Sequence, residues 1–350
     1  MKSHRVTMQD VANRANVSKT AVSLAFNDTS RLSENTLRHI LDVAAELGYS
    51  QDPAARMLRT RRTNSLGLLL PQRLDVVLEN PYYTQFLQGI GQTCHREGYT
   101  LLLAPPLRGS MLKSIPYAAV DGFIVSGLEY DRGEVSALRQ RGIPFVLVDS
   151  EEHDDVPSVE IEDDDGMRSL VEHLLALGHR RITFLAFETG VEGGPEHWRG
   201  PVFRRMRGAM AALEQRGLSL ESPGMRVVEV ECTRPAGEAA FTELWRSNER
   251  PTAVVCFSDI LALGVLDAAR ELLVSVPGDV SVTGFDDLAE ARNATPSLTT
   301  VHQPIETKGR LAAEYLVEAI SAGSSDRPHR QRLHTALLLR DSTGPLPVAP

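Results

Sequence analysis

The sequence of 350 residues has few cysteines and no long apolar run. Its three cysteines, Cys94, Cys232 and Cys256, are odd in number and far apart, and no CxxC or paired Cys/His spacing occurs. Neither a disulfide framework nor a zinc site is therefore indicated, and we expect Cys256, within the apolar run 253–257, to be a buried thiol. No segment approaches the roughly 18 uninterrupted apolar residues that predict a transmembrane helix.

Sequence signals for export and for catalysis are also missing. The first ten residues, MKSHRVTMQD, lack the apolar segment of a secretory signal, so we expect a soluble, cytoplasmic protein without a membrane partner. No P-loop, GxSxG or HExxH motif occurs, and no GxGxxG follows the first apolar run. We therefore expect neither an enzyme nor a dinucleotide-binding protein, and we predict no cofactor and no metal.

Charge is distributed unevenly along the chain, whose formal net charge is −9. Residues 1–62 carry ten Lys and Arg against six Asp and Glu, whereas the remainder carries 27 against 40. A basic head on an acidic body suits a protein whose head contacts phosphates and whose body does not. Chance variation of charge is the alternative, and only the motifs of the head decide against it.

Two short helical patterns, at 8–14 and 19–26, follow each other closely near the N-terminus. Thr7 and Asp10 have the spacing of a capping box before the first pattern, and Ser18 stands at the N-cap of the second. Small and apolar residues line one side of both patterns, which predicts a helix-turn-helix. Such a motif places the outer face of its second helix in the DNA major groove. The predicted DNA-binding residues here are Thr7, Ser18, Lys19, Thr20, Ser23 and Asn27.

An ordinary helical hairpin is the alternative to this interpretation. A third amphipathic pattern, Glu34–Leu47, makes it less attractive, because Ser33 caps that pattern, Gly48 ends it and the three helices together form a head.

From residue 65 onward, apolar runs alternate with helical stretches. This alternation is typical of parallel sheets covered by helices on both faces, and two sets of it predict two doubly wound subdomains. In such sheets, ligands bind at the carboxyl ends of the strands. The predicted strands are 66–70, 100–103, 122–125, 145–148, 182–187, 227–230, 253–257 and 280–283.

Several ordered motifs make the chain resemble the lactose-repressor/galactose-repressor (LacI/GalR) family of bacterial transcription regulators. They include VTMQDVANRANVS, SENTLRHILDVAAELGY, NPYYTQFLQGI, SDILALGVLDAA, DVSVTGFDD and PSLTTVHQP, and they span nearly the whole chain. The resemblance implies a DNA-binding head at 1–50, a hinge helix at 51–62 and a periplasmic-binding-protein-like core. The core would divide into an N-subdomain at 63–178 and 303–331 and a C-subdomain at 179–302 and 332–345, with crossovers near Gly178/His179, His302/Gln303 and Arg332.

The resemblance also implies roles for particular residues. Leu58 matches a leucine that wedges into the DNA minor groove, and Ala55 and Arg56 occupy neighbouring contact positions; a plain basic linker is the alternative. A small-molecule effector, expected to be a sugar or related polyol, would bind between the lobes. The candidate effector-binding residues are Tyr82, Tyr83, Asp165, Arg205, Ser258 and Asp286.

Each of these has a simpler alternative: the acids cap helices, Arg205 makes a surface ion pair, and the tyrosines belong to the core. Trp198 lines the cleft or covers a lobe edge. Ser258 and Leu24 depart from the residues usual in the family, asparagine and arginine, and the segment 105–119 is shorter than usual.

The function expected from these observations is a DNA-binding transcription regulator, a repressor controlled by its effector. The expected partners are a pseudo-palindromic operator in double-stranded DNA and a second copy of the chain in a homodimer. A solute-binding protein of the same fold is the alternative, and it is disfavoured by the helix-turn-helix head.

Overall fold

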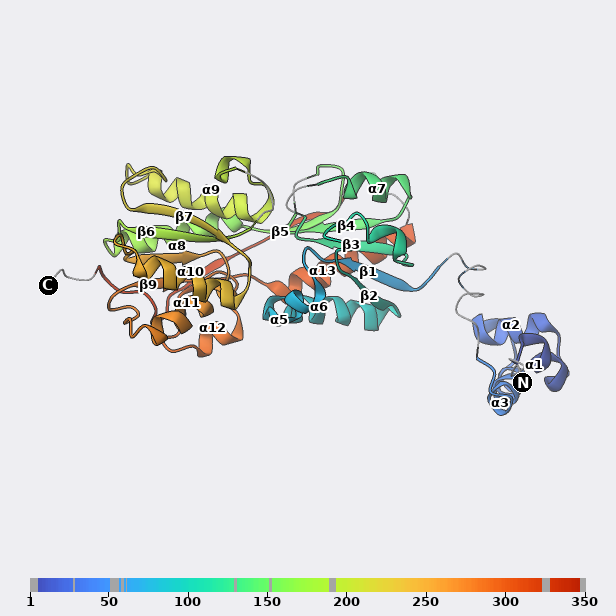
Figure 1. Cartoon of the computed structure of the whole chain (residues 1–350). Helices are drawn as coiled ribbons and strands as arrows, with labels where there is room; N and C mark the ends of the chain where they lie inside the picture. Colours follow the sequence, from blue (N-terminus) through green and yellow to red (C-terminus); the bar gives the residue numbers. More distant parts are fainter. Residues whose placement is uncertain are drawn as a thin grey trace. The chain divides into compact units, whose positions relative to one another are not determined.

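The computed structural model describes residues 6–27, 29–50, 57, 60, 62–128, 131–150, 153–188, 193–322 and 328–346. The chain divides into two compact units, Met1–Thr63 and Asn64–Pro350. Figure 1 shows an all-helical first unit and a second unit built of two α/β lobes. The predicted fold class, a helix-turn-helix head followed by a two-lobed parallel α/β core, is therefore confirmed. The predicted hinge residues Ala55, Arg56 and Leu58 lie outside the described residues.

The head consists of α1 (Met8–Ala15), α2 (Lys19–Asn27) and α3 (Glu34–Glu46). The predicted capping box is present: the Thr7 hydroxyl accepts from the Asp10 N–H at 3.3 Å, and the Asp10 carboxylate accepts from the Thr7 N–H at 2.8 Å. The joint between α1 and α2 begins at Asn16, whose φ of 53° ends α1. A shared apolar core holds the three helices together and comprises Val11, Ala12, Ala15, Val22, Ala25, Ile40, Val43 and Ala44.

The first lobe is built on a six-stranded parallel sheet of order β11-β5-β4-β3-β1-β2. Its strands are β1 (Ser65–Leu69), β2 (Thr100–Ala104), β3 (Gly122–Ser126), β4 (Phe145–Val148), β5 (Ser158–Ile161) and β11 (Arg330–Leu333). Its helices are α5 (Leu74–Glu79), α6 (Pro81–Glu97), α7 (Glu134–Gln140) and α13 (Ile305–Ala322), with a 3-10 turn at Ile115–Tyr117. Helices α6 and α13 pack closely against each other.

The second lobe is built on a four-stranded parallel sheet of order β7-β6-β8-β9. Its strands are β6 (Ile182–Phe187), β7 (Met225–Val230), β8 (Ala253–Cys256) and β9 (Ser281–Thr283), and an antiparallel pair, β10 (Thr300–His302) and β12 (Ala336–Leu338), lies beside them. Its helices are α8 (Asp163–Ala176), α9 (Gly200–Glu214), α10 (Arg234–Arg246), α11 (Asp259–Glu271) and α12 (Ala289–Asn293), with a 3-10 turn at Pro195–His197.

Three segments connect the lobes. The first leaves β5 and enters α8, the second runs from β10 to α13 through Gln303, and the third joins β11 to β12. The first crossover corrects the predicted position near Gly178/His179. Helix α8 packs on α9 and shares the core of the second lobe, so the chain changes lobe before this helix rather than after it. The misplacement arose because β5 was not among the predicted strands.

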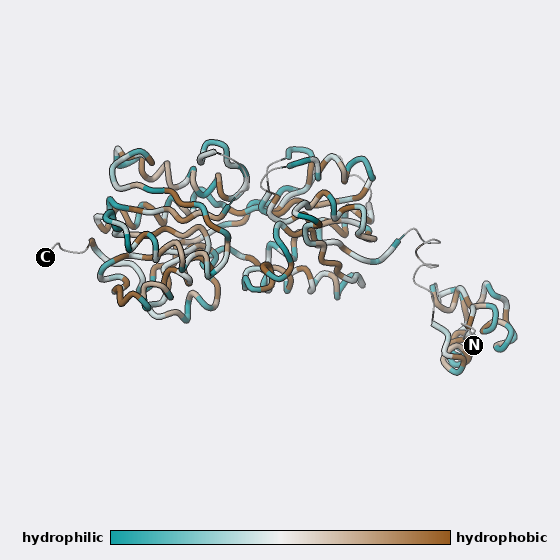
Figure 2. Tube along the Cα trace, viewed as in Figure 1, coloured by the Kyte–Doolittle hydropathy of each residue, from teal (hydrophilic) through white to brown (hydrophobic). Residues whose placement is uncertain are grey.

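The apolar cores follow the strands, which are largely brown in Figure 2. Parallel strands covered on both faces are expected to be almost continuously apolar, and β3, β4, β5 and β8 are buried along their whole length. Cys256 is fully buried, as predicted. Trp198 is fully buried in the core of the second lobe and does not line a cleft. Among the described residues, no helix is long and apolar enough to cross a membrane.

Candidate functional site

The outer surface of α2 is the first candidate site. Ser18 accepts from the Ala21 N–H at 3.1 Å and so caps the helix, while Lys19, Thr20 and Asn27 are exposed and Ser23 is half-buried. Thr7 is exposed at the start of α1. Leu24 is half-buried, beside this polar surface. The six described residues predicted to bind DNA therefore lie at the first turn of α1 or on α2, most of them open to solvent.

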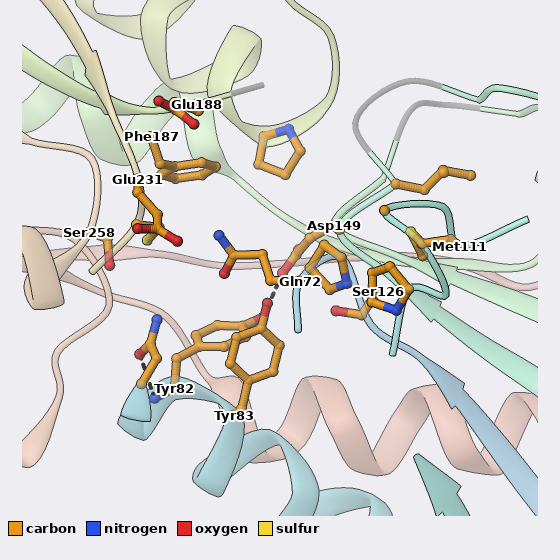
Figure 3. Close-up of a pocket in the computed structure, with 18 of the residues that line it drawn as sticks. Gln72, Tyr82, Tyr83, Met111, Ser126, Asp149, Phe187, Glu188, Glu231 and Ser258 are labelled. Atoms are coloured by element: carbon orange, nitrogen blue, oxygen red, sulfur yellow. Dashed lines mark hydrogen bonds between the residues drawn. The ribbon is translucent and has the colours of Figure 1, made fainter. Parts of the chain in front are cut away.

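The second candidate site is a cavity of about 410 Å³ lined by residues from both lobes. Its walls include the start of α6, the loop after β4, the ends of β6 and β7, and the start of α11 (Figure 3). Five of the six predicted effector-binding residues line it: Tyr82, Tyr83, Arg205, Ser258 and Asp286.

Asp165 is the exception, and its predicted role is corrected here. Its side chain is 56% exposed and pairs with Arg168 at 2.6 Å, outside the cavity. Residues 163–165 form the first turn of α8, and the helical rotation of successive residues turns Asp163 inward and Asp165 outward. The buried acid of this triplet is therefore Asp163.

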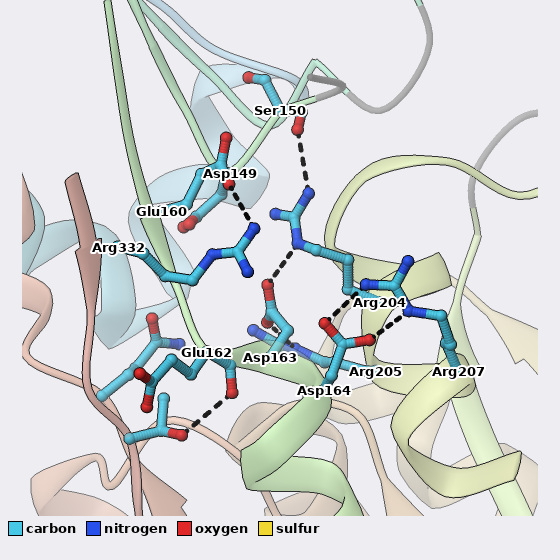
Figure 4. Close-up of polar contacts among 12 residues, drawn as sticks. Asp149, Ser150, Glu160, Glu162, Asp163, Asp164, Arg204, Arg205, Arg207 and Arg332 are labelled. Carbon is cyan, nitrogen blue, oxygen red and sulfur yellow. Dashed lines mark hydrogen bonds and ion pairs between the residues drawn. The ribbon is translucent and has the colours of Figure 1, made fainter. Parts of the chain in front are cut away.

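Asp163 holds two arginines of α9 in place (Figure 4). One oxygen accepts from Arg204 Nε at 3.0 Å and the other from Arg205 Nε at 2.8 Å, and all three side chains are almost completely buried. The Arg205 guanidinium also donates to the Phe257 carbonyl and lies 3.8 Å from the centre of the Phe285 ring. These contacts fix Arg205 as a planar donor at the cavity wall.

Asp286 is a buried acid of the second lobe that lines the cavity. Its carboxylate accepts from Ser258 Oγ at 2.9 Å and from Gln303 Nε2 at 2.5 Å. Ser258 occupies the N-cap of α11, yet its hydroxyl donates to Asp286 and makes no capping hydrogen bond to the helix. Burial raises the pKa of Asp286, and Arg205 and these two donors oppose that rise. A φ of 139° holds Asp286 in a backbone conformation that is rare for a residue with a side chain.

Asp149 is the corresponding acid of the first lobe, and the sequence analysis missed it. It also has a left-handed backbone, with φ 47°, and its Oδ2 accepts from Tyr82 Oη at 2.7 Å and from Lys308. Burial favours the neutral acid, but Lys308 and Tyr82 together bring the pKa of Asp149 below its ordinary value. The available signal was its position directly after the predicted strand 145–148, at the ligand-binding end of a parallel sheet.

The tyrosines are placed by the start of α6. Asn80 caps this helix by accepting from the Tyr82 N–H at 3.0 Å, and Pro81 occupies the first helical position. Tyr82 and Tyr83 meet edge to face with ring centres 5.2 Å apart. Burial, and then the nearby charge of Asp149, raise the pKa of Tyr82 well above its usual value, so its hydroxyl stays a donor.

The remaining cavity wall includes residues that the sequence analysis did not select. The short segment 105–119 contributes Pro106, Gly109, Ser110 and Met111. Residues at the end of β6 and just after β6 and β7 contribute Phe187, Glu188, Glu231 and Cys232. The cavity thus combines aromatic and apolar surface with carboxylates and a guanidinium, which is the chemistry that binds a hydroxylated ring. Among the described residues, no group of three or more His, Cys, Asp or Glu side chains is arranged to hold a metal.

A three-helix head with a helix-turn-helix, joined to two lobes around a polar cavity, defines the class of ligand-binding regulators with a periplasmic-binding-protein-like core. Comparison with known proteins agrees with this architecture. Residues 7–52 match the family of bacterial regulatory proteins of lacI type, and residues 171–343 match the periplasmic binding protein-like domain.

Similar proteins cover almost the whole chain. A transcriptional regulator of the helix-turn-helix type from Mycolicibacterium smegmatis is 36% identical over 337 residues, covering 89% of this chain and 90% of its own. The transcriptional repressor PurR of Escherichia coli is 33% identical over 344 residues, covering 96% of each. The chain belongs to the lacI family of bacterial transcription regulators.

Solved structures show the same fold. The regulator CelR in complex with cellobiose is 29% identical, with a TM-score of 0.70 over 97% of this chain and 100% of that one. The Lac repressor dimer bound to operator and the anti-inducer ONPF has a TM-score of 0.80 over the same shares at 24% identity, a likeness of fold.

Proposed function

We propose that this protein is a transcriptional repressor that acts by binding alone, with a small hydroxylated molecule in the lobe cavity controlling its affinity for operator DNA. The observation that carries the proposal is the cavity of about 410 Å³, in which Asp149 from the first lobe and Asp286 and Arg205 from the second meet. Its volume suits a sugar-sized ligand. A ligand that contacts both lobes binds their arrangements unequally, and this difference is what shifts an equilibrium.

The chemical class of the effector follows from the donors and acceptors. The carboxylates of Asp149 and Asp286 accept from ligand hydroxyls, and Arg205 donates. Flat apolar surface is offered by Tyr82, Tyr83 and Phe187. A sugar or a related polyol satisfies all three requirements. The sugar bound by the CelR structure supports this choice. Two copies of the chain would bind a pseudo-palindromic operator, as the operator complex of the Lac repressor dimer suggests.

Two measurements test the proposal. A thermal-shift screen against sugars, polyols and nucleosides should reveal a stabilising compound, because a ligand at 100 times its Kd stabilises by about 2.7 kcal/mol. That compound must then change the affinity of the protein for DNA upstream of its own gene in a gel shift. An unchanged affinity would contradict effector control, and no shift at all would favour a solute-binding protein.

The head is tested separately with Thr20→Ala on a set of single-base operator variants. We expect the loss of affinity to be concentrated at one base pair, by about 1–3 kcal/mol, because an exposed residue at the start of the second helix is placed for base readout. An equal loss on every operator variant would show that Thr20 contacts only the DNA backbone.

A further inference from the structure

Lys308 is a buried cation that does not belong to the cavity wall. Its side chain has no exposure to solvent, and it lies on α13 behind the lining residues. The ammonium group donates to Asp149 Oδ2, to Tyr82 Oη at 3.1 Å and to Gln303 Oε1 at 2.5 Å. A lysine ammonium has three N–H donors, so this buried charge has one acceptor for each of them.

The three partners of Lys308 come from separate parts of the fold. Tyr82 starts α6, Asp149 follows β4, and Gln303 lies in the crossover between β10 and α13. Because Lys308 can only donate, the amide oxygen of Gln303 must face it, and the amide nitrogen is left to donate to Asp286 in the second lobe at 2.5 Å. A continuous chain of hydrogen bonds thus links Asp149 to Asp286 through Lys308 and Gln303.

The same contacts leave one carboxylate oxygen of the cavity-lining residue Asp149 without a donor. Asp149 Oδ2 accepts hydrogen bonds from both Tyr82 and Lys308, whereas Asp149 Oδ1 is buried and has no hydrogen-bond partner among the described residues. Burying such an oxygen without a donor is unfavourable, and a ligand hydroxyl at the cavity would supply one.

We propose that Lys308 is a positioning residue that couples one cavity acid of each lobe: it holds Asp149 as a charged acceptor in the first lobe and, through Gln303, orients Asp286 in the second. The role of these acids toward a hydroxylated effector rests on the proposed function, whereas the coupling itself does not.

The first test is the pH dependence of stability in Lys308→Met, which keeps the length of the side chain and removes its charge. The groups facing Asp149 are Lys308 from α13, Tyr82 from α6, and Arg204 and Arg205 from α9. With Lys308 gone, burial of Asp149 dominates, and its pKa in the folded state moves above that in the unfolded chain. The variant should then lose stability relative to the wild type as the pH rises from about 4, by up to about tenfold in the folding equilibrium constant per pH unit.

Two further variants control this measurement by urea unfolding. Lys308→Met/Asp149→Asn removes both charges, so the gap from the wild type should become independent of pH and smaller than in Lys308→Met. Arg310→Met removes a positive charge from the surface of the same helix, where Arg310 pairs with Glu314, and should leave the pH profile unchanged. A Lys308→Met profile parallel to the wild type, or a double variant no more stable than Lys308→Met, would overturn the proposal. The second comparison remains decisive if Lys308→Met alone does not fold, because the double variant is then expected to fold.

Coupling between lobes is tested by a double-mutant cycle of Lys308→Met with Asp286→Asn. The combined effect on the unfolding equilibrium constant should differ from the product of the single effects by at least about threefold. Asp287→Asn is the matched control, because Asp287 is the next residue but pairs with Arg340 and His302 outside this chain of bonds. Its cycle should be multiplicative within about twofold.

Multiplicative effects in the Asp286 cycle would show that Lys308 acts only within the first lobe and would overturn the proposed coupling. Both tests use the full-length protein without any ligand. A failure of the sugar screen would therefore leave them unaffected, and their failure would leave the proposed function standing.

Discussion

The two lobes bring a buried acid to the same cavity but stabilise it by different means. In the first lobe, Asp149 contacts the ammonium of Lys308 directly, and its pKa lies below the ordinary value although burial acts against this. In the second lobe, Asp286 accepts hydrogen bonds from the neutral groups of Ser258 and Gln303. Its pKa stays above the ordinary value because burial outweighs these hydrogen bonds and the charge of Arg205.

The second lobe also buries another acid, Asp259, close to Asp286. Asp259 accepts from Thr300 Oγ1 at 2.6 Å and from the Leu288 N–H at 2.8 Å, and it has no exposure to solvent. Burial, and then the neighbouring charge of Asp286, raise the pKa of Asp259 to about 8. The comparison teaches that a cation in direct contact can bring the pKa of a buried carboxyl below its ordinary value, whereas with hydroxyl and amide donors, and a second acid close by, burial keeps the pKa raised.

The largest effect should come from breaking the buried ion pairs of Asp163 with Arg204 and Arg205. Asp163→Ala leaves Arg204 and Arg205 buried without their shared carboxylate, and the loss of one partner from a buried ion pair costs about 3–5 kcal/mol. Urea unfolding measures this. Asp164→Ala is the control, because Asp164 pairs with Arg207, whose side chain is 53% exposed, and should cost at most about 1 kcal/mol. Equal losses would contradict the importance of the buried cluster.

An effect that is smaller per pH unit, and of opposite sign in the two lobes, is expected from pH. The folded-state pKa of Asp259 is about 8, above its ordinary 3.8, so its contribution is fully present below pH 3.8 and is lost as the pH rises toward 8. For Asp149 the folded-state pKa is lowered, so its contribution is present above pH 3.8 and is lost as the pH falls.

Asp259→Asn should remove the first of these slopes, up to about 1.4 kcal/mol per pH unit. The measurement is the urea midpoint of wild type and variant between pH 4 and pH 9. The difference between the two proteins should change across that range. A constant difference would mean that Asp259 is already ionised at acidic pH, and that the two lobes do not differ as described.

The smallest effect should come from Tyr82→Phe in the first lobe. The hydroxyl of Tyr82 donates to Asp149 and accepts from Lys308, so its removal leaves a buried N–H without an acceptor, at a cost of about 1–2 kcal/mol. Tyr99→Phe, at a partly exposed position after the end of α6, should stay within about 0.5 kcal/mol in thermal unfolding. Equal small losses in both variants would show that the pair of Asp149 and Lys308 is stable without the Tyr82 hydroxyl.

Much of the fold could be predicted from the sequence because its signals are local. The capping box of Thr7 and Asp10, the cap at Ser33 and the apolar spacing of three short helices specify the head. The apolar runs of the core specify most strands of both sheets, since parallel strands are buried on both faces. The short strands β5, β10, β11 and β12 and the short helices α5 and α12 were missed, because patterns of that length do not separate strand, helix and loop. The helix α13 was also missed, although its 18 residues place apolar side chains at helical spacing.

The cavity required the tertiary structure. Tyr82, Arg205, Ser258 and Asp286 could be selected from motifs, but three consecutive acids at 163–165 look alike in the sequence, and only the rotation of α8 decides that Asp163 turns inward and Asp165 outward. Asp149 and Lys308 are 159 positions apart. A lysine on the inner side of a helix, in line with Ile305, Ala312 and Leu316, signals a buried charge, but not its partner. Sequence by itself determined most of the helices and strands and the exposed face of α2, because these depend on neighbours along the chain. Which acids meet which cations was decided only by the packing of the lobes, because a buried charge is stabilised by groups that are distant in sequence and close in space.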